Sequence, residues 1–183
     1  MIVVRRAELS DADSLAETAA RAFPLGCPKG TPQSDLDRFI QTELTAERFA
    51  SHIANRANEL SVAMAGERMA GFSMLCKESP LPAAGARVIQ CKNPLELRKI
   101  YVLPEFHGCG AGDALMRAAI ARAKEVKAGC IWLSVSKFNE RGLAFYRKHE
   151  FKVAGNATFL VGSDLQEDFL MVRQARASAL PRK

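Results

Sequence analysis

The chain has 183 residues, of which 48% are hydrophobic and 25% are charged. These values are typical of a folded globular domain and exclude collagen-like and low-complexity chains. No run approaches the roughly 20 apolar residues of a membrane span, and the start of the chain lacks the apolar run of a signal peptide. We therefore expect one domain over residues 1–174, a basic tail over residues 175–183, a cytoplasmic location and no membrane partner.

The chain carries 26 lysine and arginine residues against 20 aspartate and glutamate residues, a net charge of +6. Such an excess favours an anionic ligand, and nucleic acid is one alternative. The longest basic run is only Arg5-Arg6, and Trp132 and two tyrosines are the aromatic residues besides the phenylalanines. A surface that stacks nucleotide bases needs more of them between its cations, so we expect no nucleic-acid partner.

The five cysteines are odd in number and widely spaced, and no two of them form a CxxC pair. This pattern predicts reduced thiols rather than a disulfide framework. The three histidines are equally scattered, so we expect no metal site.

The first part of the chain predicts a strand, a loop, three helices and a β-hairpin. Ser10 is the expected N-cap of the first helix, Thr45 is the expected N-cap of the third, and Gly66 begins the hairpin turn. In chain order, the segments are a strand at 2–6, a helix after Ser10, a loop at 23–32, a helix from Ser34, a helix after Thr45, and strands at 60–65 and 69–76.

Later segments alternate between strands and helices, with a second loop rich in proline and glycine at 79–85. Pro104 ends a long strand, and an apolar stripe at helical spacing follows. The expected segments are strands at 95–103, 131–135, 153–161 and 168–173, and helices at 113–127 and 139–149.

The most informative stretch leads from the strand at Ile100 into Gly108-x-Gly110-x-Gly112 and then into a helix. Glycines allow a sharp turn and a close approach of an anion, and a helix start offers unpaired N–H groups at its positive end. The pattern therefore predicts a phosphate cradle, although a glycine turn without a ligand fits it too. It lacks the Lys-Ser/Thr of a Walker loop and the GxGxxG spacing of a dinucleotide fold.

At this point the chain resembles the GCN5-related N-acetyltransferase superfamily, in element order over nearly its whole length. The resemblance is sharpest from Leu97 to Phe151 and depends on two motifs. The loop at 107–112 is similar to the family's Gln/Arg-x-x-Gly-x-Gly/Ala signature, and Trp132–Phe151 looks like its strand followed by Asn-x-x-x-x-x-Phe-Tyr. Lys-Ile-Tyr-Val-Leu-Pro-Glu with Asn-Glu-Arg-Gly-Leu-Ala-Phe-Tyr looks most like the branch that includes polyamine N-acetyltransferases.

The resemblance implies an α/β fold with a mixed, mostly antiparallel sheet of six to seven strands, splayed open between the 97–102 and 131–135 strands. Acetyl-CoA would lie in that cleft as a cosubstrate, and no metal is implied. The Val102 N–H would polarise the thioester carbonyl. The implied cofactor-binding residues are Ile100, Tyr101, Val102, His107, Gly108, Cys109, Gly110, Ala111, Gly112, Asp113, Asn139 and Lys148.

For catalysis, the resemblance implies that Tyr146 is the general acid that protonates the departing thiolate. The position of Tyr146 on the expected helix, taken alone, fits the alternative of a buried core residue. Glu96 is the candidate general base, with a solvated strand end or a water chain as the alternatives. Lys148 fits an exposed helix lysine as well as a phosphate ligand.

Three positions depart from the family's pattern. His107 replaces the usual Gln or Arg and can be neutral at pH 7, and Asp113 puts a carboxylate near the expected phosphate. Glu150 stands where a glycine usually ends the helix, so a left-handed backbone there would cost about 1 kcal/mol.

The expected function is therefore direct, acetyl-CoA-dependent acetylation of a primary amine on a small molecule, such as a polyamine, or on a peptide. A non-catalytic acetyl-CoA sensor is the alternative, and a homodimer is allowed. The acceptor wall is expected from residues 23–47 and 79–85. The acidic side chains of the first segment either select a cation or form a solvated helix face.

Overall fold

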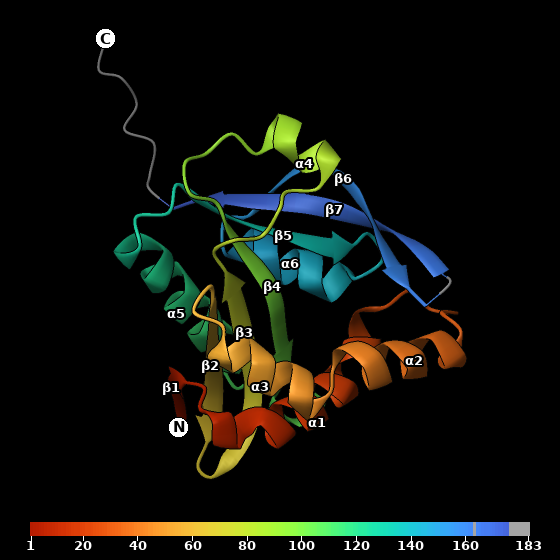
Figure 1. The fold of residues 1–183 in the computed structure, drawn as a ribbon, viewed down its shortest axis with the longest axis vertical. Helices are drawn as coiled ribbons and strands as arrows, with labels where there is room; N and C mark the ends of the chain where they lie inside the picture. The colour runs from red at the N-terminus through yellow and green to blue at the C-terminus, as the bar shows by residue number, and fades with distance from the viewer. Residues whose placement is uncertain (163, 176–183) are drawn as a thin grey trace.

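The computed structural model describes residues 1–162 and 164–175, which form an α/β domain around one seven-stranded sheet (Figure 1). The strand order is β1-β2-β3-β4-β5-β7-β6. The strands are β1 (Ile2–Arg6), β2 (Asn58–Ala65), β3 (Arg68–Cys76), β4 (Leu95–Val102), β5 (Cys130–Ser136), β6 (Lys152–Val161) and β7 (Asp164–Gln174). The helices are α1 (Ala12–Ala22), α2 (Gln33–Glu43), α3 (Ala46–Ala54), α4 (Ala83–Val88), α5 (Ala111–Glu125) and α6 (Glu140–Lys148), with short 3-10 turns η1 (Leu9–Asp11), η2 (Phe23–Gly26) and η3 (Pro104–Phe106).

The sheet opens between its two halves. Strands β1 to β4 pair antiparallel in sequence order, and β5 pairs antiparallel with β7. The parallel contact between β4 and β5 is limited to Leu95 opposite Ile131 and Glu96 opposite Trp132. Beyond these pairs the two strands part, which confirms the predicted splayed, mostly antiparallel sheet.

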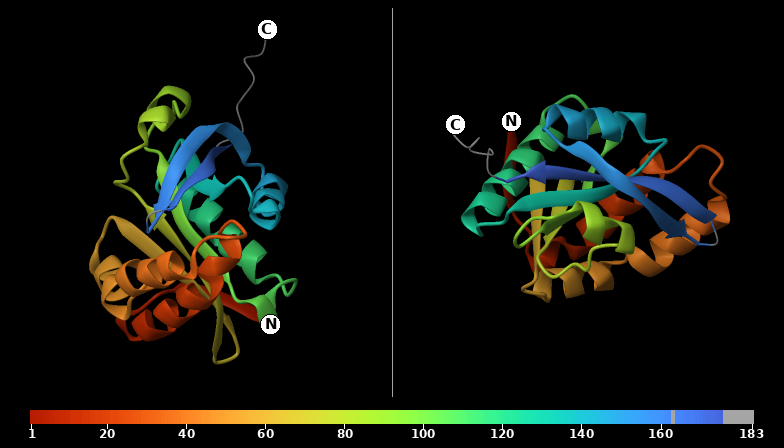
Figure 2. Two further views of the ribbon diagram at one scale, coloured as in Figure 1. Left: turned by 90° about the vertical axis from the view of Figure 1, so that its right-hand side faces the viewer. Right: turned by 90° about the horizontal axis from the view of Figure 1, so that it is seen from above.

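Helices cover both faces of the sheet. Helices α1 to α3 lie on one face, and α5 and α6 lie on the other (Figure 2). Phe49 of α3 packs on Phe72 of β3 in the first layer, whereas Met116 of α5 packs with Ile131 and Met171 in the second. The cleft at the splay therefore opens between two well-packed layers.

An irregularity in β4 changes which side chains face each layer. The register with β3 passes from Leu97 to Lys99, so Arg98 has no partner. Such a bulge reverses the alternation of side chains along the strand. Leu97 accordingly packs on the α5 layer, whereas Tyr101 packs on the layer of α1 to α3.

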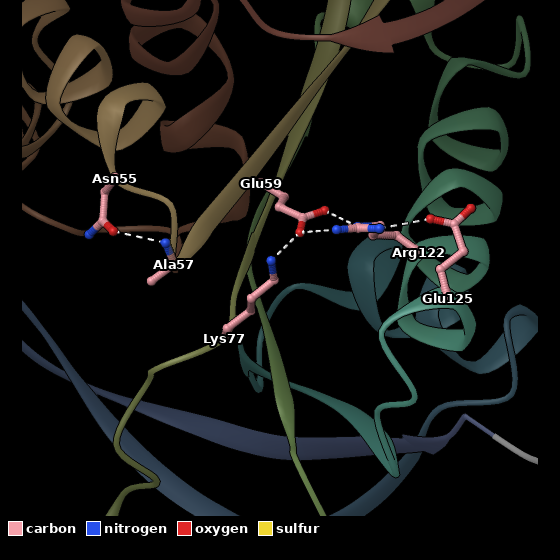
Figure 3. A network of polar contacts seen from close by, with 6 residues as sticks. All are labelled: Asn55, Ala57, Glu59, Lys77, Arg122 and Glu125. Carbon is pink, nitrogen blue, oxygen red and sulfur yellow. Dashed lines mark hydrogen bonds and ion pairs between the residues drawn. The ribbon is translucent and has the colours of Figure 1, made fainter.

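A polar network joins the hairpin to α5 (Figure 3). The carboxylate of Glu59 on β2 accepts from the guanidinium of Arg122 and forms an ion pair with Lys77. Arg122 also contacts Glu125 one turn later on α5. These donors hold the pKa of Glu59 below its ordinary value, against the opposing effect of burial.

Several sequence predictions are confirmed. The hairpin forms with its turn at Gly66, Thr45 caps α3 by accepting from the Arg48 N–H, and Asn139 caps α6 by accepting from the Gly142 N–H. Two others are wrong. Ser10 does not cap a helix, because Glu8 and Asp11 form a capping box one turn earlier, with Asp11 also paired to Arg5.

The second wrong prediction is the uninterrupted loop at 79–85. Its C-terminal part begins the short helix α4, with Pro82 at the N-cap. Proline suits a helix start because its fixed φ is already helical and it lacks the N–H that would go unpaired there. Proline in this segment therefore signalled a helix start as well as a loop.

The prediction of five reduced cysteines is also wrong. Cys91 and Cys130 form a disulfide, whereas Cys27, Cys76 and Cys109 are free. The Gly129 N–H donates to the Lys92 carbonyl at 2.7 Å, so the turn before β4 lies against the start of β5. This contact brings together two cysteines that are 39 residues apart in sequence.

The predicted basic tail lies mostly outside the described residues, which end at Ala175. Within the described ranges, no helix combines the length and apolarity needed to cross a bilayer. The same ranges contain no group of three histidine, cysteine or acidic side chains arranged to hold a metal ion.

Candidate active site

A cavity of about 820 Å³ fills the splay between β4 and β5 and continues to the start of α5. Its walls come from the loop after α1, from β4, β5, β7 and α6, and from the glycine loop. The predicted site residues that line it are Glu96, Ile100, Tyr101, Val102, His107, Gly108, Gly110, Ala111, Gly112, Asp113, Asn139, Tyr146 and Lys148. The exception is Cys109, which is exposed beside the cavity and donates its thiol proton to the Phe106 carbonyl.

The glycine loop forms a left-handed turn that leads directly into α5. Gly108 and Gly110 have φ values of +79° and +86°, and a Cβ at either position would meet no atom within 4 Å. The first helical hydrogen bond runs from the Ala114 N–H to the Gly110 carbonyl, so the N–H groups of residues 111–113 lack a backbone acceptor. This open, donor-rich helix start fits a phosphate group.

His107 and Arg141 act as a pair at this loop. Arg141 Nη1 lies 2.7 Å from His107 Nδ1, and His107 Nε2 lies 2.9 Å from the Val102 carbonyl oxygen. A guanidinium can only donate, so Nδ1 accepts and the ring proton sits on Nε2. The ring is thus a neutral bridge, and Arg141 on α6 supplies the positive charge that the sequence analysis missed at this loop.

Asp113 is bound by α6. Its carboxylate accepts from Lys148 Nζ at 2.8 and 3.0 Å and lies 2.8 Å from His149 Nε2. These contacts, led by the hydrogen bond from Lys148, lower the pKa of Asp113. Asp113 and Lys148 therefore offset each other's charge beside the cradle and tie the first turn of α5 to α6.

The edge of β4 offers backbone groups to the cleft at alternate residues. The Leu103 N–H donates to Ala70 of β3, whereas the Val102 carbonyl accepts from His107 on the cleft side. The N–H and C=O of one strand residue point to the same side, so Ile100 and Val102 face the cleft. Tyr101 directs its backbone to β3 and contributes its ring to the cavity wall.

A glycine on β3 makes this edge possible. A Cβ at Gly71 would lie 2.3 Å from the Tyr101 carbonyl oxygen and 3.0 Å from Val102 Cα. Only a residue without a side chain therefore lets β3 approach β4 closely enough to hold Val102 at the cleft.

Tyr146 reaches the cavity from the second turn of α6. Its ring packs edge-on against Phe145 and Phe151, at centroid distances of 5.6 and 5.8 Å. Burial raises the pKa of the phenol, and within the described residues the hydroxyl has no hydrogen-bond partner. Burial therefore keeps the phenol protonated near neutral pH, so that it has a proton to give and cannot take one.

Glu96 lies at the last β4–β5 pair and is already engaged. Its Oε2 accepts from Ser79 Oγ at 2.5 Å and forms an ion pair with Arg98 at 2.7 Å. Its charge is thus paired, which does not favour the predicted base role.

The cavity contains further polar groups that the sequence analysis did not select. Asp168 on β7 is 5% exposed and accepts from Ser134 Oγ at 2.6 Å. Lys99 lines the opposite wall without a hydrogen bond or ion pair to any described residue, and burial lowers its pKa. The strand pattern gave no signal for either side chain, because the bulge at Arg98 and the β5–β7 pairing direct them to the cavity.

The fold and this cleft are those of an acyltransferase, and the comparison with known proteins identifies its family. The model of the acetyltransferase (GNAT) family matches residues 15–151, and the chain belongs to that family. It is 34% identical over 166 residues to an uncharacterized N-acetyltransferase of Mycobacterium bovis, an alignment that covers 91% of this chain and 99% of the relative. A second uncharacterized N-acetyltransferase, from Lactobacillus delbrueckii subsp. lactis, is 24% identical over 143 residues, which are 78% of this chain and 80% of the relative.

Solved structures show the same fold. The PaiA N-acetyltransferase of Thermoplasma acidophilum, solved in complex with coenzyme A, aligns with a TM-score of 0.76 at 21% identity over 95% of this chain and 99% of that one. The ribosomal-protein-S18-alanine N-acetyltransferase of Escherichia coli aligns with a TM-score of 0.69 at 17% identity over 100% of this chain and 99% of that one.

Proposed function

We propose that this protein transfers the acetyl group of acetyl-CoA directly to a primary amine. The observation that carries this proposal is a single cavity that joins a donor-rich cradle, an open strand edge and a protonated tyrosine. Family membership and the coenzyme A complex of the structurally similar PaiA protein support it.

The residues present fit acetyl-CoA. The helix start at Ala111 to Asp113 and the guanidinium of Arg141 suit the pyrophosphate, and the open edge at Ile100 and Val102 suits the amide groups of the pantetheine arm. Asn139 lines the same cavity from the N-cap of α6. When bound there, acetyl-CoA supplies the activated acetyl group.

The chain's own groups then assist the transfer. The Val102 N–H stabilises negative charge on a carbonyl oxygen held at the strand edge. Tyr146 donates its phenolic proton to the departing sulfur. No covalent acyl-enzyme is needed, and Cys109 lies outside the cavity wall.

The acceptor is proposed to be a primary amine of a small molecule or a peptide. Glu43 and Asp168 give the cavity negative charge, whereas Arg98 and Lys99 give it positive charge. A polyamine is a cation and would interact favourably only with the carboxylates. This mixed lining therefore supports the general class of amines better than the polyamine subclass. Of the other acidic residues in the expected acceptor wall, Asp37 accepts from Gln33 and does not line the cavity.

A turnover screen tests the proposal. The protein is incubated with acetyl-CoA and with polyamines, amino acids, aminoglycosides or peptides, and released thiol is followed together with the mass of the amine. Acetylation of at least one amine class is expected. Acetyl-CoA binding without transfer to any amine would reject the catalytic function and favour a non-catalytic sensor.

A further inference from the structure

Asp168 is a buried carboxylate of the cavity, and among the described residues it forms no ion pair. It is 5% exposed and lines the same cavity as Val102 and Tyr146. Within the described residues its side chain has one polar partner, the Ser134 hydroxyl, and no ion pair. By comparison, the charge of Glu96 is paired with Arg98 at 2.7 Å.

The strand register aims Asp168 into the acceptor end of the cleft. Ser136 pairs with Asp168 and Ser134 with Leu170, so both serines share a face of the sheet with Asp168. The bulge in β4 puts Tyr101 on the face of α1 to α3, where its ring lines the same cavity. Asp168 thus enters the cavity from β7, while Tyr101 forms the opposite wall on β4.

The pKa of Asp168 is shifted by burial and by the hydrogen bond from Ser134, and by no neighbouring cation. From the segment after η2 comes the Cys27 thiol, whose pKa is raised to about 11 by burial and then by the charge of Asp168. Strand β5 contributes Ser134 and Ser136, and β6 places Ala157 opposite it. None of these groups carries a positive charge.

A buried carboxylate that lacks a cation is costly unless a cation binds beside it. Burial raises the pKa of Asp168, which makes its carboxylate a stronger proton acceptor than an exposed one. Cys27, Tyr101 and Tyr146 line the same cavity, and all three stay protonated near neutral pH because burial raises their pKa values. Unlike these three groups, Asp168 is suited to take a proton.

We propose that Asp168, held by Ser134, binds the ammonium group of the acceptor and takes one proton from it before the amine attacks. This inference rests on the proposed function. The neutral amine forms a C–N bond to the acetyl carbon of the thioester while the C–S bond breaks, and the sulfur leaves with the electron pair. Tyr146 protonates that sulfur, the new amide loses its second N–H proton, and that proton restores the tyrosine. The proton on Asp168 passes to solvent, so one proton is released per turnover.

The test compares two amines of similar size, ethylamine and 2,2,2-trifluoroethylamine. Ethylamine is protonated at pH 7 and needs the carboxylate, whereas the fluorinated amine is largely neutral and does not. For Asp168→Asn we expect kcat/KM to fall roughly 10²-fold with ethylamine, the scale of general-base help, and only a few-fold with trifluoroethylamine. Glu167→Gln, a neighbouring exposed change, is the matched control and should leave both values unchanged.

A second measurement keeps the result independent of turnover. Acetyl-CoA should raise the melting temperature of Asp168→Asn as much as that of the unmodified protein, because Asp168 is assigned to the acceptor. An equal loss with both amines, or a lost acetyl-CoA shift, would show a merely structural role and overturn the inference. Unchanged kcat/KM with both amines would overturn it too, while leaving the proposed function intact. Absence of turnover by the unmodified protein on every amine would overturn both.

Discussion

At the scale of single residues, the proposed function assigns protonation of the thiolate to Tyr146 of α6. Tyr146→Phe keeps the ring and its packing on Phe151 and removes only the hydroxyl. Because that group is proposed to act on the departing sulfur, we expect kcat to fall by roughly 10²-fold with little change in KM.

The measurement is steady-state kinetics on the best amine of the screen, together with acetyl-CoA affinity. Affinity should stay within a few-fold of that of the unmodified protein. Unaltered turnover would show that Tyr146 only packs, and that water or another group protonates the thiolate.

Arg141 provides a positive charge beside the glycine loop, where His107 provides none. Removing a charge-assisted hydrogen bond costs about 1.5–3 kcal/mol, so Arg141→Ala should weaken acetyl-CoA binding by at least about tenfold. Calorimetric titration with acetyl-CoA measures this loss. Arg147→Ala, on the exposed side of the same helix, is the control, and equal effects of the two variants would contradict a specific role for Arg141.

At the scale of elements, helix α6 is followed by a residue with a left-handed backbone, the possibility raised above for position 150. Glu150 has a φ of +66° and forms an ion pair with Arg173 at 2.7 Å. Glu150→Gly removes the strain of the Cβ, about 1 kcal/mol, and loses an ion pair worth less, because the Glu150 carboxylate is exposed and Arg173 keeps its hydrogen bonds to the His149 and Gln174 carbonyls. We expect a net gain of roughly 0.5 kcal/mol in the free energy of unfolding.

Chemical denaturation measures that gain. Glu150→Gln is the matched control, since it keeps the Cβ and removes the charge, and it should be neutral or slightly destabilising. A glycine variant less stable than the glutamine variant would contradict the left-handed helix end.

Sequence patterns predicted most elements because each has a local signature. Asn139 and Thr45 are good N-caps, and the glycine spacing after Val102 marked the cradle. The patterns failed where a distant contact decides the structure. Arg5 engages Asp11 and moves the first helix cap away from Ser10, and the bulge at Arg98 depends on pairing with β3.

The residues of the candidate site also fall into two groups, those with a local sequence signature and those that a distant contact places. The cradle and Tyr146 are contiguous motifs, so the resemblance found them. Arg141, Lys99 and Asp168 enter the cavity through tertiary packing, and no local spacing distinguishes them from surface residues. Their roles depend on which charges lie beside them, a property that only the fold defines.

At the scale of the whole molecule, the disulfide links the turn before β4 to β5. Closing a loop of this length is worth about 2–4 kcal/mol, so reduction should lower the melting temperature. Thiol titration of the denatured, non-reduced protein should find three free cysteines and five after reduction. Five thiols before reduction, or a Cys91→Ser variant as stable as the oxidised protein, would contradict the linkage.

The central claim is that the cleft between β4 and β5 binds acetyl-CoA, and a melting assay tests it most directly. A ligand that binds only the folded state adds about 2.7 kcal/mol of stability at a hundredfold excess over its Kd. Acetyl-CoA should therefore raise the melting temperature clearly more than free adenosine does, because the proposed pyrophosphate and pantetheine contacts lie at the cradle and the strand edge. An unchanged melting temperature at millimolar acetyl-CoA would contradict both the enzyme and the sensor.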